Sequence, residues 1–210
     1  MLDGFLRPLI DPPLNRVGRA FAAGGVTADA VTLAGLALGL IAAATIALGA
    51  PGWALLPLAA SRIADGLDGA VARASRTTDF GGYLDITADF LFYGAIPLGF
   101  VLLDPTSNAV AGAVLLLAFY VNGASFLGFA ILAEKRGLET GAQGVKNLYY
   151  SGGLLEGTET IAFFVLLCVW PAGFAQLAYG FAALCFLTAV TRVMHARRVF
   201  AEKLQDPAGS

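Results

Sequence analysis

Three long stretches of this 210-residue chain contain no aspartate, glutamate, lysine or arginine, and they restrict its fold more than any other feature. They run from Ala30 to Ser61, from Pro105 to Ala133 and from Thr160 to Thr191. A helix needs about 20 apolar residues to cross the hydrocarbon core of a bilayer, so each stretch has room for one or two crossings. Only 13% of the residues are charged, whereas soluble domains have about a quarter. The sequence therefore predicts an all-α integral membrane protein.

Turn signals divide the apolar sequence into six predicted transmembrane helices. The chain is expected to turn at "APGW", at "DPTSN" and at "PAG", and the polar segment "EKRGLETGAQGVKN" separates the fourth helix from the fifth. The predicted crossings are residues 30–49, 53–74, 81–103, 109–133, 151–170 and 173–193. They form one domain, residues 26–200, between an N-terminal segment, residues 1–25, and a tail, residues 201–210.

The N-terminal segment contains a short amphipathic sequence, "LNRVGRAFAA", which follows two prolines. In it, Arg16 and Arg19 are set against Leu14, Val17 and Phe21. A helix with this pattern lies on the membrane surface, with its apolar side in the lipid, rather than crossing the bilayer. The predicted fold is thus a six-helix transmembrane bundle preceded by an amphipathic surface helix.

The basic residues indicate how this bundle is oriented. All 13 lysines and arginines fall on one side of the six-crossing arrangement: Arg7, Arg16, Arg19, Arg62, Arg73, Arg76, Lys135, Arg136, Lys146, Arg192, Arg197, Arg198 and Lys203. Cytoplasmic loops are enriched in such residues, so this side, with both termini and the surface helix, is predicted to be cytoplasmic. We expect a multi-pass protein of a bacterial inner or plasma membrane. Its net charge of −2 suits no nucleic-acid partner.

Two pairs of aspartates interrupt the apolar sequence. Asp65 and Asp68 are three residues apart near the end of the second crossing, and Asp85 and Asp89 are four apart near the start of the third. Each spacing places a pair on one helix face, and a short loop makes the two helices antiparallel neighbours. Four carboxylates gathered in a low dielectric repel each other unless cations intervene. Two divalent ions, Mg²⁺ or Mn²⁺, would balance four negative charges and suit carboxylate ligands.

The residues between the aspartates indicate phosphate chemistry. Mg²⁺ keeps coordination positions that phosphate oxygens fill, so a carboxylate-bound pair of ions favours transfer at a phosphate. Gly69, Ala72 and Gly81 leave space for a ligand beside the carboxylates. Arg73 lies eight residues after Asp65, on roughly the same helix face, where a guanidinium can bind a diphosphate.

The segment "DGLDGAVARASRTTDFGGYLDITAD", residues 65–89, fits the pattern D-x-x-D-G-x-x-A-R followed by G-x-x-x-D-x-x-x-D. The chain therefore resembles the CDP-alcohol phosphotransferases, also called CDP-alcohol phosphatidyltransferases. The matching positions are Asp65, Asp68, Gly69, Ala72, Arg73, Gly81, Asp85 and Asp89. The surface helix, six crossings and cytoplasmic position of the motif extend the resemblance to nearly the whole chain. It implies an enzyme that replaces the CMP of a CDP-linked lipid or alcohol with an acceptor hydroxyl.

The resemblance also implies a role for each matching residue. Asp65, Asp68 and Asp85 would hold the divalent metals, and Asp89 would help to hold one of them and act as the general base on the acceptor hydroxyl. An acceptor that approaches the phosphate opposite the leaving CMP does need a base within hydrogen-bond reach of its proton. The nucleotide and its diphosphate would be bound by Asp65, Gly69, Ala72, Arg73, Gly81 and Thr32. Where the family has asparagine, three residues before Thr32, this chain has Asp29.

The acceptor is less clearly indicated than the donor. The expected reaction transfers a phosphatidyl group from CDP-diacylglycerol to a small hydroxyl acceptor, a polyol or polyol phosphate, and releases CMP. The candidate acceptor-binding residues are Lys135, Lys146, Glu156, Glu159 and Arg192. The bundle of residues 26–200 is thus the predicted catalytic domain, and the family resemblance allows it to form a homodimer.

Two alternatives differ in reaction or in class. A CDP-amino-alcohol could be the donor and diacylglycerol the acceptor, although members with that activity tend to be longer. A small cation transporter could use the aspartates as an ion path. Against this second alternative, the acids gather at one membrane face, whereas transporter sites lie near the midplane between inverted repeats, and the sequence shows no repeat.

Overall fold

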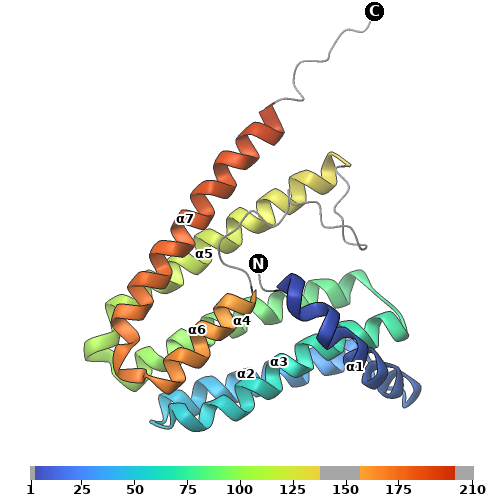
Figure 1. The fold of residues 1–210 in the computed structure, drawn as a ribbon, viewed down its shortest axis with the longest axis horizontal. Helices are drawn as coiled ribbons and strands as arrows, with labels where there is room; N and C mark the ends of the chain where they lie inside the picture. The colour runs from blue at the N-terminus through green and yellow to red at the C-terminus, as the bar shows by residue number, and fades with distance from the viewer. Residues whose placement is uncertain (1–2, 138–156, 202–210) are drawn as a thin grey trace, which may run out of the picture.

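The computed structural model describes residues 3–137 and 157–201, and the regular structure within these ranges is entirely helical (Figure 1). The helices are α1 (Asp3–Ala23), α2 (Ala28–Ala47), α3 (Pro51–Ala74), α4 (Asp79–Leu103), α5 (Pro105–Lys135), α6 (Gly157–Val169) and α7 (Phe174–Ala201), with a 3₁₀ turn, η1 (Pro171–Gly173), before α7. Helices α2, α3 and α4 pack together, and α5 and α7 lie side by side and extend beyond the rest of the bundle (Figure 1).

Four segments within the described ranges are long and apolar enough to cross a membrane: α2, α4, α5 and the segment Pro171–Ala201 that contains α7. The described part of α6 is apolar but has only 13 residues. Helix α3 has 24 residues, but it carries Arg62, Asp65 and Asp68 among its apolar residues. The chain is therefore an all-α multi-pass membrane protein, with four spans evident from length and composition.

Helix boundaries differ from the predicted crossings mainly at the ends. The starts and ends of α2, α3 and α4 lie within two residues of the predicted bounds. Helix α5 begins four residues earlier than predicted and ends two residues later, and α7 continues eight residues past residue 193. Residues 151–156, the predicted start of the fifth crossing, lie outside the described residues.

Helix α1 is longer than predicted, because it extends back through Pro12 and Pro13 to Asp3. Its second half contacts α3. Leu14 packs against a small apolar cluster that includes Leu67 and Val71. Gly18 lies so close to Ala70 that a Cβ there would stand 2.7 Å from the Ala70 backbone. Helix α1 therefore packs along the helix that carries the first aspartate pair.

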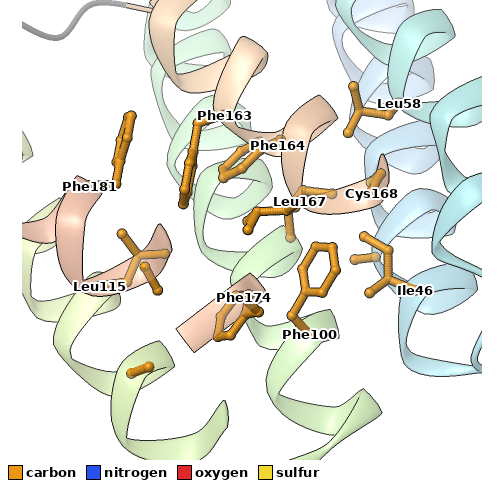
Figure 2. Packing of buried hydrophobic residues seen from close by; sticks show 14 of the residues in the cluster. Ile46, Leu58, Phe100, Leu115, Phe163, Phe164, Leu167, Cys168, Phe174 and Phe181 are labelled. Carbon is orange, nitrogen blue, oxygen red and sulfur yellow. The ribbon is translucent and has the colours of Figure 1, made fainter. Parts of the chain in front are cut away.

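A continuous apolar core joins the other helices (Figure 2). In it, the ring of Phe100 from α4 stacks on Phe174 at the start of α7, and Phe163 of α6 stacks on Phe181 of α7. Phe92 of α4 belongs to the same core and is completely buried. The helix turn that follows Asp89 therefore packs in the same core as α6 and α7.

Glycine allows α2 to approach α3 and α4 closely. A Cβ at Gly39 would stand 2.5 Å from the Phe92 ring and 3.1 Å from Oγ of Ser61. A Cβ at Gly99 would stand 2.6 Å from the carbonyl oxygen of Ala43. This close packing brings polar residues of α2, α3 and α4 together around the aspartates.

Candidate active site

The second half of α3 and the first half of α4 carry the two aspartate pairs, and a short loop joins the helices. Thr78 ends that loop and caps α4, where its hydroxyl accepts a 3.0 Å hydrogen bond from the Gly81 N–H. Asp65, Asp85 and Asp89 are half-buried, and one carboxylate oxygen from each lies within 4.8 Å of the others. The structure therefore brings together three of the four predicted metal ligands from two different helices.

Asp68 lies beside this group and is bound from a third helix. It is only 6% exposed, and its Oδ2 accepts a 2.7 Å hydrogen bond from the Thr32 hydroxyl of α2. A buried carboxylate needs such a donor, since leaving it unpaired is costly. Thr32, which the sequence assigned to the nucleotide, thus contacts an aspartate in this structure.

Arg62 occupies the centre of the carboxylate group, and sequence reasoning missed this. Its Nη1 donates to Oδ1 of Asp89 at 3.1 Å and to Oδ1 of Asp65 at 3.3 Å. Arg62 is one of the basic residues that predict the topology, but it lies twelve residues before the end of α3. Its spacing of three residues from Asp65 was the available signal. The contact with Asp89 depends on how α2 packs against both α3 and α4, and it is not visible in the sequence.

A pocket opens between α2, α3 and α4 at this point. Its lining residues are Thr32, Gly35, Leu36, Arg62, Asp65, Asp68, Ala88 and Asp89. The polar groups are carboxylates, one hydroxyl and one guanidinium, and small residues from α2 and α4 complete the wall. The pocket therefore presents carboxylate oxygens beside a guanidinium.

The predicted nucleotide residues lie toward the ends of α3 and α4. Arg73 is exposed, and its Nη2 donates to Oδ1 of Asn15 on α1 at 3.0 Å. A Cβ at Gly69 would stand 3.2 Å from Nη1 of Arg73, and Ala72 is half-buried. A Cβ at Gly81 would stand 3.1 Å from Oδ1 of Asp29. The residue that replaces the family's asparagine thus faces the start of α4.

The candidate acceptor residues are spread over three segments. Lys135 is exposed in the last turn of α5, and Glu159 lies in the first turn of α6. Lys146 and Glu156 lie outside the described residues. The beginning of α6 is near the site, because a Cβ at Gly157 would stand 3.5 Å from the hydroxyl of Tyr93, which follows Asp89 by one helical turn on α4.

Arg192 of α7 is bound to α5. Its Nη1 donates to the carbonyl and the side-chain oxygens of Asn122, at 3.0 and 2.9 Å, and to Oγ of Ser125 at 2.8 Å. The neighbouring Gly123 packs directly against the ring of Phe90 on α4, which follows Asp89 in the sequence. Residue contacts therefore connect Arg192, through α5, to the helix turn that carries Asp89.

The donor atoms of the site suit a hard divalent cation. Asp65, Asp85 and Asp89 offer carboxylate oxygens, which Mg²⁺ and Mn²⁺ prefer. The chain's single histidine, His195, stacks on Phe129 between α5 and α7. The carboxylate group therefore suits a hard cation rather than a soft metal or one that prefers nitrogen ligands.

Fold and site together define a multi-pass membrane enzyme with a carboxylate cluster at the α3–α4 pair. Residues 25–196 match the family described as CDP-alcohol phosphatidyltransferase. The chain belongs to this family and is accordingly a transferase of phospholipid synthesis. This membership sets aside the cation-transporter alternative.

Relatives support the assignment over different lengths. The chain is 49% identical over 193 residues to the inner membrane protein YnjF of Escherichia coli, which covers 92% of this chain and 94% of that protein. It is 37% identical over 98 residues to the archaetidylinositol phosphate synthase of Pyrococcus horikoshii. That match covers 46% of this chain and 52% of the archaeal protein.

Two solved structures of the Mycobacterium tuberculosis phosphatidylinositol phosphate synthase PgsA1 share the fold. The one with CDP-DAG bound has a TM-score of 0.65 at 21% identity and covers 88% of this chain and 93% of that one. The one in complex with manganese and citrate has a TM-score of 0.66 at 22% identity and covers 87% and 88%. At these identities the likeness establishes the fold.

Proposed function

We propose that this chain transfers a phosphatidyl group from CDP-diacylglycerol to the hydroxyl of a polyol or polyol phosphate and releases CMP. The observation that supports this most is the convergence of carboxylate oxygens from Asp65, Asp85 and Asp89. Asp68 lines the adjoining pocket together with Asp65 and Asp89. A family that handles CDP-linked alcohols needs charge compensation at a diphosphate, and carboxylates from two helices supply the ligands for it.

Asp65, Asp68, Asp85 and Asp89 would hold two divalent ions, Mg²⁺ or Mn²⁺. When bound, such ions neutralise the negative charge that develops on the phosphate oxygens during transfer. The manganese in one PgsA1 structure supports an ion of this kind. Thr32 contributes indirectly, because its hydrogen bond fixes the carboxylate of Asp68.

Asp89 would accept the proton of the attacking hydroxyl. Its side chain is 33% exposed at the pocket wall, so an acceptor can reach it. A carboxylate within hydrogen-bond reach of a hydroxyl can act as a general base.

The nucleotide and diphosphate would lie along the ends of α3 and α4. Gly69, Ala72 and Gly81 are small residues there, and the Arg73 guanidinium supplies positive charge. Asp29 faces Gly81 and adds a hydrogen-bond acceptor to this end of the site. The name of one PgsA1 structure, with CDP-DAG bound, supports CDP-diacylglycerol as the donor.

An inositol phosphate is the first acceptor to test. The archaeal relatives are named as archaetidylinositol phosphate synthases, and PgsA1 as a phosphatidylinositol phosphate synthase. Arg192, held by Asn122 and Ser125, would bind the acceptor's phosphate, and Lys135, Lys146, Glu156 and Glu159 are the further candidates.

In the bilayer, α2 to α7 would form six crossings, with α1 on the surface and both termini on the cytoplasmic side. The exposed Val17 and Phe21 of α1 support its contact with lipid. The paired α5 and α7, with exposed apolar residues, leave a surface on which a homodimer could form.

The direct test measures CMP release from CDP-diacylglycerol by the purified chain in proteoliposomes. Inositol phosphate, glycerol phosphate, free inositol and serine are supplied in turn with Mg²⁺ or Mn²⁺. We expect release with a polyol or polyol phosphate and none after chelation of divalent ions. Release with CDP-ethanolamine and diacylglycerol instead would favour the amino-alcohol alternative, and no release with any pair would refute the proposal.

A further inference from the structure

Arg62 is a buried cation that the proposed chemistry does not use. One nitrogen, Nη1, contacts carboxylate oxygens of both Asp65 and Asp89, at 3.3 and 3.1 Å. A Mg²⁺ ion binds oxygen at about 2.0–2.1 Å. An ion that used these same two oxygens would therefore stand within a few ångströms of Nη1. The ion and the guanidinium would compete for the same carboxylate oxygens.

The rest of the side chain is held from two other directions. The Arg62 guanidinium carbon lies 3.7 Å from the centroid of the Phe92 ring. Nη2 lies 3.1 Å from Oγ of Ser61, which donates at 2.7 Å to the carbonyl oxygen of Gly35 on α2. Phe92 and Ser61 are completely buried, so these two supports cannot easily move.

These supports keep the positive charge at the site even when a contact is lost. The Arg62 side chain is only 16% exposed. If an ion displaced Nη1 from Asp89, stacking on Phe92 would still hold the guanidinium within a few ångströms of that ion. Like charges at such a distance repel strongly in a medium less polar than water. The nearby guanidinium should therefore weaken metal binding.

We propose that Arg62 is an internal competitor of the divalent cation at Asp65 and Asp89. Without metal its single positive charge offsets part of the negative charge of the two carboxylates, which helps them to remain close together. With metal it gives up at least one of these contacts, and its charge lowers the affinity of the site. This inference rests on the metal site of the proposed function and adds a residue that tunes it.

The test measures Mn²⁺ binding to the full-length chain in detergent micelles, from the electron paramagnetic resonance signal of free Mn²⁺. Arg62→Met removes the charge at similar length, and Arg62→Gln keeps a hydrogen-bond donor and serves if the first variant does not fold. We expect either change to tighten Mn²⁺ binding by about tenfold or more. Arg62→Lys keeps the charge, so its affinity should stay near that of the wild type.

Arg136→Met is the matched control. It also removes one arginine, but Arg136 donates to the carbonyl oxygen of Phe200, between the ends of α5 and α7. Its Mn²⁺ affinity should be unchanged. Unfolding midpoints of all variants show which ones are folded.

Two kinds of failure can be told apart. Unchanged or weaker Mn²⁺ binding in folded Arg62→Met or Arg62→Gln would overturn the competitor role alone and leave Arg62 as a structural partner of the carboxylates. Wild-type chain that binds no Mn²⁺, or binds it equally well after Asp65→Asn, would overturn the metal site and the competitor role together.

Discussion

The Thr32 hydroxyl of α2 donates a 2.7 Å hydrogen bond to Oδ2 of Asp68 on α3, and both side chains are buried. This contact attaches the second motif aspartate to a helix outside the motif. We expect Thr32→Val to destabilise the folded chain by about 1–3 kcal/mol, because it leaves a buried carboxylate oxygen without a donor. The unfolding midpoint in detergent measures this. Thr32→Ser, which keeps the hydroxyl, is the control, and equal midpoints for the two variants would contradict the expectation.

If Asp89 is the general base, its replacement should lower turnover and leave donor binding nearly unchanged. Asp89→Asn keeps the size of the side chain and its carbonyl oxygen but cannot accept the acceptor's proton. We expect kcat to fall by about 10²-fold or more, the usual contribution of such a base, while binding of CDP-diacylglycerol changes little. CMP release and donor binding are measured on the same preparation. A variant with nearly full activity would refute the assignment.

The clustering of the aspartates could be anticipated because much of the information is local. The spacings of Asp65 from Asp68 and of Asp85 from Asp89 follow from helix periodicity, and a short loop joins their helices. The metal and nucleotide roles of these residues remain predictions. Asp68 differs from the other three in pairing with Thr32, which depends on how α2 packs.

The contacts of Arg62 could not be predicted from the sequence. Counting basic residues on one side of the membrane treats each of them as a charge near the end of a crossing. A guanidinium within α3 instead needs partners, and two of them, Asp89 and Phe92, come from α4. Only the folded arrangement, in which α2 packs against both α3 and α4, reveals these two contacts. The contacts of α1 with α3 likewise depend on packing that the sequence does not reveal.

If Arg192 binds the acceptor's phosphate, its loss should affect one substrate selectively. We expect Arg192→Met to raise the KM for a polyol phosphate by about tenfold or more, because it removes a charge-assisted hydrogen bond, with little effect on the KM for the donor. Steady-state CMP release at varied concentrations of each substrate measures both values. Arg197→Met, which removes another charge from α7, is the control. An equal rise in both KM values would point to a structural role for the contacts with Asn122 and Ser125.

Because α2 lies close to α4 at Gly39, we expect a single methyl group added there to disturb the site through Phe92. A Cβ at Gly39 would collide with the Phe92 ring, whose other contacts include the Arg62 guanidinium. We expect Gly39→Ala to destabilise the chain by about 1–3 kcal/mol, as overpacking usually does. Gly94→Ala is the matched control, since no atom lies within 4 Å of its added Cβ. Unfolding midpoints in detergent compare the two, and a Gly39→Ala variant as stable as Gly94→Ala would show that Phe92 can shift without cost to the bundle.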